Sequence, residues 1–344
     1  YRIACNSSER SAEIMIERSK IRRYHAPVWD EPVIMEMGHT GRRGLVFERV
    51  EQEIADVIGS AKALVPPSMY REDLAALPEL SEPEVQRHYL HLSQETLGMM
   101  GISLFGTCTM KYNPKRNERI AAFDGLAQIH PYQPEETVQG MLQLLYGLQN
   151  MLAEISGLPV VSLQPAAGAH GELAGMLMIH AYHTAKGNPR KKVLLPDSAH
   201  GTNPASVALG GFVPREVKSD KRGRVDIDDL NSKLDREVAG MMLTQPNTLG
   251  LFEDHIDEIS NAVHEVGGLM YMDGANLNAI VGLCKSADMG FDIIHINLHK
   301  TFSTPHGGGG PGSGPIAVIK KLQKYLPTPK VCLKKTGEYY WDND

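Results

Sequence analysis

The stretch Ile293-Ile294-His295-Ile296-Asn297-Leu298-His299-Lys300-Thr301-Phe302 places a lysine just past a short apolar run that is typical of a buried strand. Upstream, the run Leu269-Met270-Tyr271-Met272 is followed by Asp273, so a second predicted strand ends in an acid. Ligands of mainly parallel sheets lie beyond the carboxyl ends of the strands. We therefore expect Asp273 and Lys300 to meet at one site.

This pairing of an acid and a lysine is the arrangement that pyridoxal phosphate requires. A lysine forms the Schiff base, and an acid keeps the pyridine nitrogen protonated so that the ring accepts electrons. Two simpler interpretations stay open. A lysine in a loop is most often a solvated surface charge, and Lys300 could also be an internal ion-pair partner for Asp273, since a buried carboxylate without a cation would take up a proton.

Apolar runs and helical segments alternate after about residue 135, which predicts an α/β fold. A helix is expected to begin at Pro134-Glu135-Glu136-Thr137, because acids suit its first turn. Strands are predicted at 159–163, 192–196, 212–217, 239–244, 268–273, 291–297 and 315–319, and further helices at 171–186, 203–210, 227–235 and 253–266. This alternation predicts a mainly parallel sheet that is flanked by helices on both faces.

Three further loops at predicted strand ends carry candidate ligand-binding groups. The segment from Gln164 to Glu172 has small residues before a helix, which suits a phosphate, although a plain tight turn is equally compatible. His200 is flanked by small residues and could lie flat on a ring, although a lone histidine is more often a structural hydrogen bonder. The segment from Thr244 to Gly250 could hold a phenolate oxygen or be turn chemistry alone.

A metal site is the rival interpretation of the histidines. His295, His299 and His306 lie close together in sequence, with Asp273 and Asp292 nearby. Zinc usually needs three or four converging ligands that include a short-spaced pair, whereas His295 and His299 straddle a predicted strand end, which leaves their relative geometry open. We therefore predict no metal.

The composition is that of an ordinary globular protein. The 344 residues are 42% hydrophobic and 22% charged, with a formal net charge of −6, which does not favour nucleic-acid binding. No segment resembles a membrane span or a signal-peptide core, and the four cysteines include no close pair. We expect free or buried thiols, a cytoplasmic location and no membrane association.

The first 95 residues differ from the rest of the chain in being rich in proline and charge. They predict an irregular arm that wraps a neighbouring chain, with short helices near 48–60 and 82–97. Such an arm implies a permanent partner.

The chain resembles the P-protein family of the glycine cleavage system, specifically the second subunit of its two-subunit prokaryotic form. The matching segments keep the order of the family along almost the whole chain. They are Gly41–Gly44, Gly106–Pro114, His130–Thr137, Gln164–Glu172, Ser198–Ser206, Tyr271–Ala279 and Asn297–Gly312.

The resemblance implies the aspartate-aminotransferase fold (fold type I) with bound pyridoxal 5′-phosphate. Lys300 then corresponds to the Schiff-base lysine, Asp273 to the partner of the pyridine nitrogen and His200 to the histidine stacked on the ring, and these three are the implied catalytic residues. Thr202 and Asn203 would face the substrate. The implied cofactor-binding residues are Ala167, Gly168, Ala169, His200, Thr202, Thr248, Asp273, Asn276, His299 and Lys300. Gly307 and Gly308 would serve the phosphate of a partner.

The implied reaction is decarboxylation of glycine with transfer of the aminomethyl group to the lipoyl arm of the H-protein. His200 or His299 would act as general acid or base. The implied partners are subunit 1, in an α2β2 heterotetramer, and the lipoylated H-protein. Two alternatives remain: another glycine-using enzyme of this fold, similar to serine hydroxymethyltransferase or an aldolase, and a non-catalytic assembly subunit.

The chain departs from the family in three places. Gln245 stands where the family usually has asparagine, and Gly38-His39-Thr40 replaces a serine-rich segment. Family members also continue beyond the end of this chain into a small domain that closes the site. We therefore expect an arm at 1–95, a cofactor-binding large domain at 96–325, and at 326–344 the truncated start of the small domain, with Lys334–Tyr340 as an edge strand.

Overall fold

The computed structural model describes residues 29–44, 48–73, 75–95, 114–302, 304 and 312–343. The chain divides into two compact units, Tyr1–Ile102 and Ser103–Asp344, which are described separately. No helix in the described part of the chain is both long enough and apolar enough to cross a membrane. Of the four cysteines, Cys284 and Cys332 lie in the described ranges, and both are free thiols.

The first unit has short helices and little buried apolar surface. Its elements are η1 (Ile34–Glu36), α1 (Gln52–Ile58), α2 (Ala61–Leu64), η2 (Pro67–Met69) and α3 (Glu82–Glu95). Glu31 joins the amino-terminal segment to α3, because its carboxylate lies 2.7 Å from His88 and 2.7 Å from His91. The expected helices near 48–60 and 82–97 are thus present as α1 and α3.

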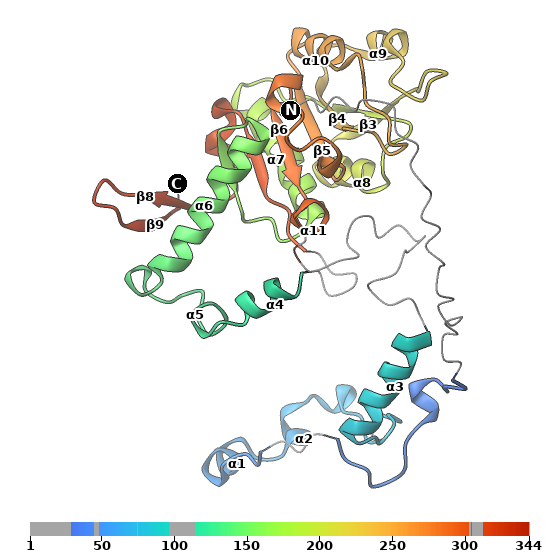
Figure 1. The fold of residues 1–344 in the computed structure, drawn as a ribbon, viewed down its shortest axis with the longest axis vertical. Coiled ribbons are helices and arrows are strands. Elements are labelled where there is room, and N and C mark those ends of the chain that lie inside the picture. The colour runs from blue at the N-terminus through green and yellow to red at the C-terminus, as the bar shows by residue number, and fades with distance from the viewer. Residues whose placement is uncertain are drawn as a thin grey trace, which may run out of the picture. The chain divides into compact units, whose positions relative to one another are not determined.

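The second unit is built on a seven-stranded sheet with the order β1-β7-β6-β5-β4-β2-β3 (Figure 1). The neighbouring pairs from β6 to β3 are all parallel, whereas β7 runs antiparallel to both β6 and β1. The strands are β1 (Val160–Ser162), β2 (Lys192–Pro196), β3 (Val213–Val217), β4 (Val238–Thr244), β5 (Leu269–Gly274), β6 (Ile293–Ile296) and β7 (Ile316–Val318). The predicted mainly parallel sheet is confirmed, with all seven strands at the expected places.

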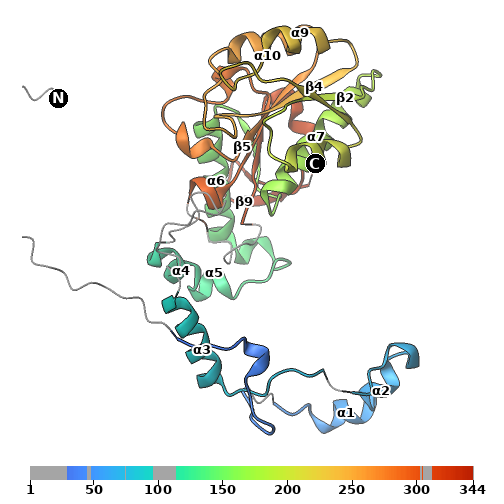
Figure 2. The ribbon, with the colours of Figure 1, turned by 90° about the vertical axis from the view of Figure 1, so that its right-hand side faces the viewer.

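Helices cover both faces of this sheet (Figure 2). One face packs on α7 (Gly168–Ala185) and α8 (Thr202–Leu209), and the other packs on α6 (Gln139–Ser156), α9 (Ile227–Lys233) and α10 (Ile256–Glu265). The remaining elements are α4 (Lys115–Ala121), α5 (Asp124–Ala127), η4 (Glu135–Thr137), η5 (Leu277–Ala279), η6 (Ala287–Met289), α11 (Leu298–Thr301) and η7 (Lys320–Tyr325).

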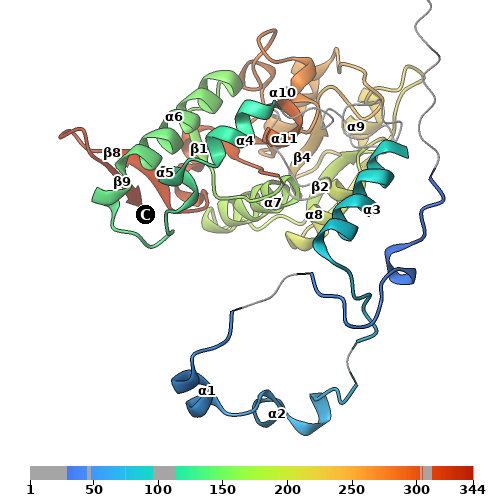
Figure 3. The same cartoon turned by 60° about the horizontal axis from the view of Figure 1, so that its bottom comes forward.

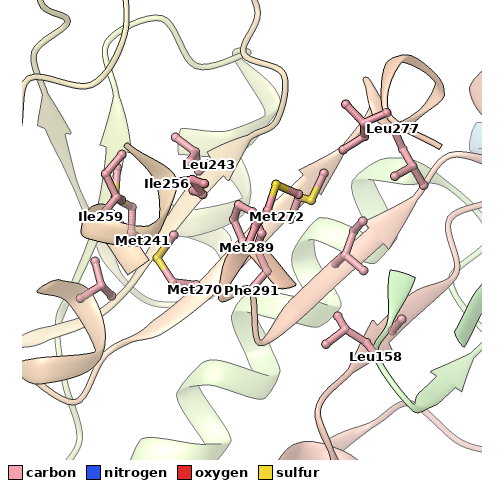
Figure 4. Close-up of a cluster of buried hydrophobic side chains, with 14 of the residues drawn as sticks. Leu158, Met241, Leu243, Ile256, Ile259, Met270, Met272, Leu277, Met289 and Phe291 are labelled. Atoms are coloured by element: carbon pink, nitrogen blue, oxygen red, sulfur yellow. The ribbon is translucent and has the colours of Figure 1, made fainter. Parts of the chain in front are cut away.

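Each face of the sheet has its own hydrophobic core. On the side of α10, methionines of β4 and β5 interlock with Ile256, Ile259 and Phe291 (Figure 4). Met241, Met270 and Met272 are fully buried there. Unbranched methionine side chains fill irregular gaps between a helix and a twisted sheet. Because the central strands are buried on both faces, they form continuous apolar runs, which is why the sequence identified them.

Several element boundaries differ from the sequence prediction, among them the start of α7, which lies at Gly168 rather than at 171. The Glu135–Thr137 segment is a 3-10 turn, and the α-helix begins only at Gln139. α10 begins at Ile256 rather than at 253, because the backbone N–H of Glu253 donates to the Gln245 side chain at 3.0 Å.

A further difference lies near the carboxyl end. Lys334–Glu338 is the turn of a hairpin between β8 (Lys330–Leu333) and β9 (Tyr339–Asp342), so most of the expected edge strand is a turn. Gln139 donates to Tyr339 O at 2.8 Å and Gln149 donates to Val331 O at 3.0 Å, so the hairpin lies beside α6 (Figure 3).

Candidate active site

A cavity of about 510 Å³ lies at the carboxyl ends of the parallel strands. All ten residues that the sequence analysis proposed for the cofactor line it, so loops that are far apart in sequence converge as expected. The lining residues are Ala167, Gly168, Ala169, Glu172, His200, Thr202, Thr244, Thr248, Asp273, Ala275, Asn276, His295, Asn297, His299 and Lys300.

Asp273 is the buried acid of the cavity and is held on three sides. It is paired in register with Thr244 on β4 and with His295 on β6, so the three side chains form a row across the sheet. Thr244 Oγ1 donates to Asp273 Oδ2 at 3.1 Å, and the Ala275 N–H donates to Oδ1 at 2.9 Å. His295 Nε2 lies 3.6 Å from Oδ1. These contacts fix the direction of the carboxylate.

Lys300 enters the cavity from α11, the single helical turn that follows β6. The backbone N–H groups of Lys300 and Thr301 both donate to Asn297 O at 3.0 Å, which turns the chain sharply after the strand. Lys300 is partly buried. Burial raises the pKa of Glu172 and lowers that of His295, and the positive charge of Lys300 opposes the first shift and adds to the second. The ammonium group therefore acts on the same buried cluster as Asp273.

The loop that precedes α7 forms one wall with closely packed backbone. Ala167 is extended and α7 begins at Gly168, so the first N–H groups of an 18-residue helix face this region. A Cβ on Gly314 would lie 2.0 Å from Ala167 O, and a Cβ on Gly168 would lie 2.2 Å from Asn297 Nδ2. Only glycine allows these approaches, and the open helix start suits an anion.

His200 is held at the edge of the cavity by the start of α8. Its Nδ1 accepts from the Thr202 backbone N–H at 3.2 Å and lies 2.5 Å from Thr202 Oγ1. Asn203 is fully buried, donates to Thr244 at 3.5 Å and does not line the cavity.

The loop after β4 is held mainly by its own hydrogen bonds. Asn247 Oδ1 accepts from the N–H groups of Leu249 and Leu251, each at 3.0 Å. Asn276 Nδ2 donates to Pro246 O at 2.9 Å and Asn247 O at 3.2 Å, which ties the loops after β4 and β5 together. Thr248 is exposed and reaches the cavity. Turn chemistry therefore holds this loop in place, and Thr248 lines the cavity.

His299 is 7% exposed and lines the cavity beside Lys300. Its Nδ1 accepts from the Ser313 N–H at 3.3 Å. His306, Gly307 and Gly308 fall outside the described residues.

Glu172 is a cavity residue that the sequence analysis did not propose. Its carboxyl group is buried and accepts from Ser206 Oγ at 3.1 Å. Burial, and secondarily the negative charge of Asp273, raises the pKa of Glu172 to about 8. A signal was present, because Glu172 is the only Asp, Glu, Lys or Arg in the 18 residues of α7. A lone charge in a buried apolar helix suggests a function for that residue.

One group of side chains in the described part of the chain has the spacing of a metal site. Ligand atoms of Glu172, Asp273 and His295 lie within 4.8 Å of one another. Asp292, which the metal hypothesis included, belongs elsewhere, because it lies 2.7 Å from His264 and accepts from the Met270 N–H. Of the three histidines in that hypothesis, His295 is the only one in the group.

The order of the sheet and the place of the cavity define a class of α/β proteins, those with the aspartate-aminotransferase type of fold. Within this class, residues 53–337 match the glycine cleavage system P-protein family. The chain belongs to that family, as its sequence motifs indicated.

Curated relatives carry the name "probable glycine dehydrogenase (decarboxylating) subunit 2". The protein of Chloroherpeton thalassium is 53% identical over 90% of this chain and 62% of its own length. The protein of Caldanaerobacter subterraneus subsp. tengcongensis is 52% identical over 91% and 64%, and that of Pyrococcus furiosus is 51% identical over 91% and 62%. The chain thus spans slightly less than two thirds of the length of these relatives.

Solved structures confirm the fold class. A crystal structure of glycine decarboxylase (P-protein) of the glycine cleavage system matches with a TM-score of 0.71 and 22% identity, over 87% of this chain and 69% of that one. Sphingosine-1-phosphate lyase of Burkholderia pseudomallei matches with a TM-score of 0.55 and 14% identity, over 80% and 67%. At these identities the likeness concerns the fold alone.

Proposed function

We propose that this chain carries the pyridoxal-phosphate site of a glycine-decarboxylating P-protein. The observation that supports this most strongly is that Asp273 and Lys300 line one cavity, together with the start of α7, in a member of that family. Bound there, pyridoxal phosphate would supply an electron sink for the bond that breaks when glycine loses carbon dioxide. The residues of the chain would bind and orient the cofactor.

The donor set of the cavity fits this cofactor at both of its ends. The start of α7 offers backbone N–H groups for a phosphate, and the Nδ2 atom of Asn297 has no acceptor among the described residues. At the other end, the Asp273 carboxylate is oriented by Thr244 and Ala275. A cavity of about 510 Å³ is within the usual range for small-molecule sites, about 300–1,000 Å³.

In this proposal each residue has a definite task. Lys300 attaches the cofactor, and Asp273 holds the proton on the pyridine nitrogen. Ala167, Gly168 and Ala169 take the phosphate, and His200 lies on the ring. Thr202, Thr248, Asn276 and His299 complete the binding site.

The partners and the reaction of the whole protein are part of the same proposal. The relatives are named as a second subunit, which supports a companion subunit, here an α2β2 assembly with subunit 1. The aminomethyl group would pass to the lipoyl arm of the H-protein. We propose the domain limits given above and a cytoplasmic location, which the free thiols Cys284 and Cys332 support.

The alternatives have less support. Another glycine-using enzyme of this fold would not match the P-protein family over residues 53–337. A non-catalytic assembly subunit would need neither a lysine nor an oriented carboxylate in the cavity. Glycine-dependent exchange of labelled bicarbonate, measured with the companion subunit and H-protein, tests the proposal. No exchange by a cofactor-loaded complex would contradict it.

A further inference from the structure

Along one wall of the cavity, a buried chain of hydrogen bonds runs from β5 to the residue after β6. Tyr271 Oη lies 2.9 Å from His295 Nδ1, and His295 Nε2 lies 3.1 Å from Asn297 Oδ1. The three side chains are 0%, 1% and 3% exposed. We call Tyr271, His295 and Asn297 the buried relay. The proposed function so far gives a task only to its last member, Asn297.

The chemistry of the three groups fixes where the hydrogens lie. Asn297 presents its carbonyl oxygen to His295, so Nε2 must be the nitrogen that carries hydrogen. Complete burial lowers the pKa of His295 despite the attraction of Asp273, so the ring is neutral and Nδ1 is an acceptor. Tyr271 then donates its hydroxyl hydrogen. Burial also holds the pKa of Tyr271 well above its usual value, so that hydrogen is retained.

The relay determines which end of the Asn297 amide, the oxygen or the nitrogen, is available to a ligand in the cavity. With Oδ1 occupied by His295, the two hydrogens of Nδ2 point the other way. A Cβ on Gly168 would lie 2.2 Å from Nδ2, so the amino group lies directly against the start of α7. Nδ2 makes no hydrogen bond to a described residue, and Asn297 lines the cavity, so this donor is suited to a ligand there.

Three glycines of α7 allow the helix to pack closely against the relay. A Cβ on Gly175 would lie 2.1 Å from the Tyr271 ring, and one on Gly171 would lie 2.8 Å from His295 Cβ. Gly168, Gly171 and Gly175 lie on one side of the helix, and each faces one member of the relay. The relay side chains are thus confined between the helix backbone and the sheet.

We propose that Tyr271 and His295 are positioning residues, which orient the Asn297 amide so that its Nδ2 donates to the phosphate group of the cofactor. The inference rests on the proposed function, since pyridoxal phosphate is its ligand. The same Nε2–H lies 3.6 Å from Asp273 Oδ1, so one imidazole stands between the two ends of the cavity.

The test compares binding of pyridoxal phosphate and of pyridoxal, which lacks the phosphate, to the full chain by absorbance titration. Tyr271→Phe removes one hydroxyl and keeps the ring. We expect it to raise the Kd for pyridoxal phosphate about tenfold, which corresponds to one hydrogen bond to a charged group, and to leave the Kd for pyridoxal within about twofold. Asn297→Asp replaces the donor with an acceptor and should raise the Kd for pyridoxal phosphate further.

The matched control is Tyr182→Phe. Tyr182 belongs to the same hydrophobic core, but its hydroxyl meets Lys186 at 2.6 Å, away from the cavity. We expect no change for either ligand. If Tyr271→Phe raised the Kd values for both ligands equally, or changed neither, the inference would be overturned. Binding of pyridoxal phosphate by the wild-type chain would still support the proposed function. If Tyr271→Phe did not fold, the test would rest on Asn297→Asp. An unchanged ratio of the Kd for pyridoxal to the Kd for pyridoxal phosphate in that variant would overturn the inference. A wild-type chain that bound neither ligand would refute both.

Discussion

Carboxyl oxygens of Glu172 and Asp273 lie within 4.8 Å of each other in the buried floor of the cavity. Two carboxyl groups at this distance cannot both ionise at low cost, so one of them keeps its proton. Glu172 does so, because burial, and secondarily Asp273, raises its pKa to about 8.

This pairing predicts an unusual pH dependence of stability. Glu172 has a pKa of about 8 in the folded chain and an ordinary value near 4.5 when unfolded. The folded state therefore binds more protons between these values, and the contribution of Glu172 to stability falls as the pH rises from about 4.5 to 8. The slope has an upper limit of about 1.4 kcal/mol per pH unit.

Glu172→Gln should remove this slope, because an amide does not titrate. The free energy of unfolding of the cofactor-free chain is measured by denaturant titration at several pH values from 5 to 8. The difference between wild type and variant cancels the other titrating groups, including His295. We expect the variant to gain stability relative to wild type as the pH rises, and parallel curves would contradict the assignment.

Asp273→Asn tests the charge at the pyridine end. An amide does not hold a proton on the pyridine nitrogen, so glycine-dependent bicarbonate exchange should fall by at least about 100-fold, the typical effect of losing one well-placed charged or polar group. Cofactor should still bind, and the rates are compared at matched cofactor occupancy. Exchange at the wild-type rate in the loaded variant would refute this role.

Gly175→Ala and Gly147→Ala test how closely α7 packs on the sheet. At Gly175 a Cβ would lie 2.1 Å from the Tyr271 ring, so overpacking should lower the free energy of unfolding by about 1–3 kcal/mol. At Gly147, in α6, nothing lies within 4 Å of an added Cβ, and alanine should stabilise the helix by about 0.5–1 kcal/mol. Equal effects of the two variants would argue against the close approach of α7.

His200 is predicted to serve as a flat surface for the cofactor ring. His200→Phe preserves such a surface and His200→Ala removes it. We expect alanine to raise the Kd for pyridoxal phosphate by about 3- to 10-fold, as for other stacked rings, and phenylalanine to change it little. If the imidazole is also the general acid or base, phenylalanine should still lose exchange activity. Identical Kd values for both variants would exclude stacking.

The sequence was sufficient to predict the sheet and the loops at its carboxyl edge. Central strands such as β4 and β5 are buried on both faces, so they appear as apolar runs bounded by polar turns. Asp273 and Lys300 could be recognised because Asp273 ends such a run and Lys300 lies four residues after another one.

The cluster along one wall of the cavity could not be predicted in the same way. His295 lies within β6, and its contact with Asp273 depends on the pairing register of the two strands, which no local pattern reveals. The sequence around Tyr271 indicates an ordinary core residue, because the position of its hydroxyl beside His295 depends on the tertiary structure. The start of α10 was misplaced because Glu253 closes a loop onto Gln245, a contact between residues on either side of a turn.

The central claim is that Lys300 attaches pyridoxal phosphate, and borohydride trapping tests it most directly. The chain is incubated with the cofactor, reduced, digested and analysed by mass spectrometry. We predict a pyridoxyl group on the peptide that contains Lys300, together with visible absorbance before reduction, and neither in Lys300→Ala. Stoichiometric labelling of a different lysine, or equal labelling of Lys300→Ala, would contradict the account.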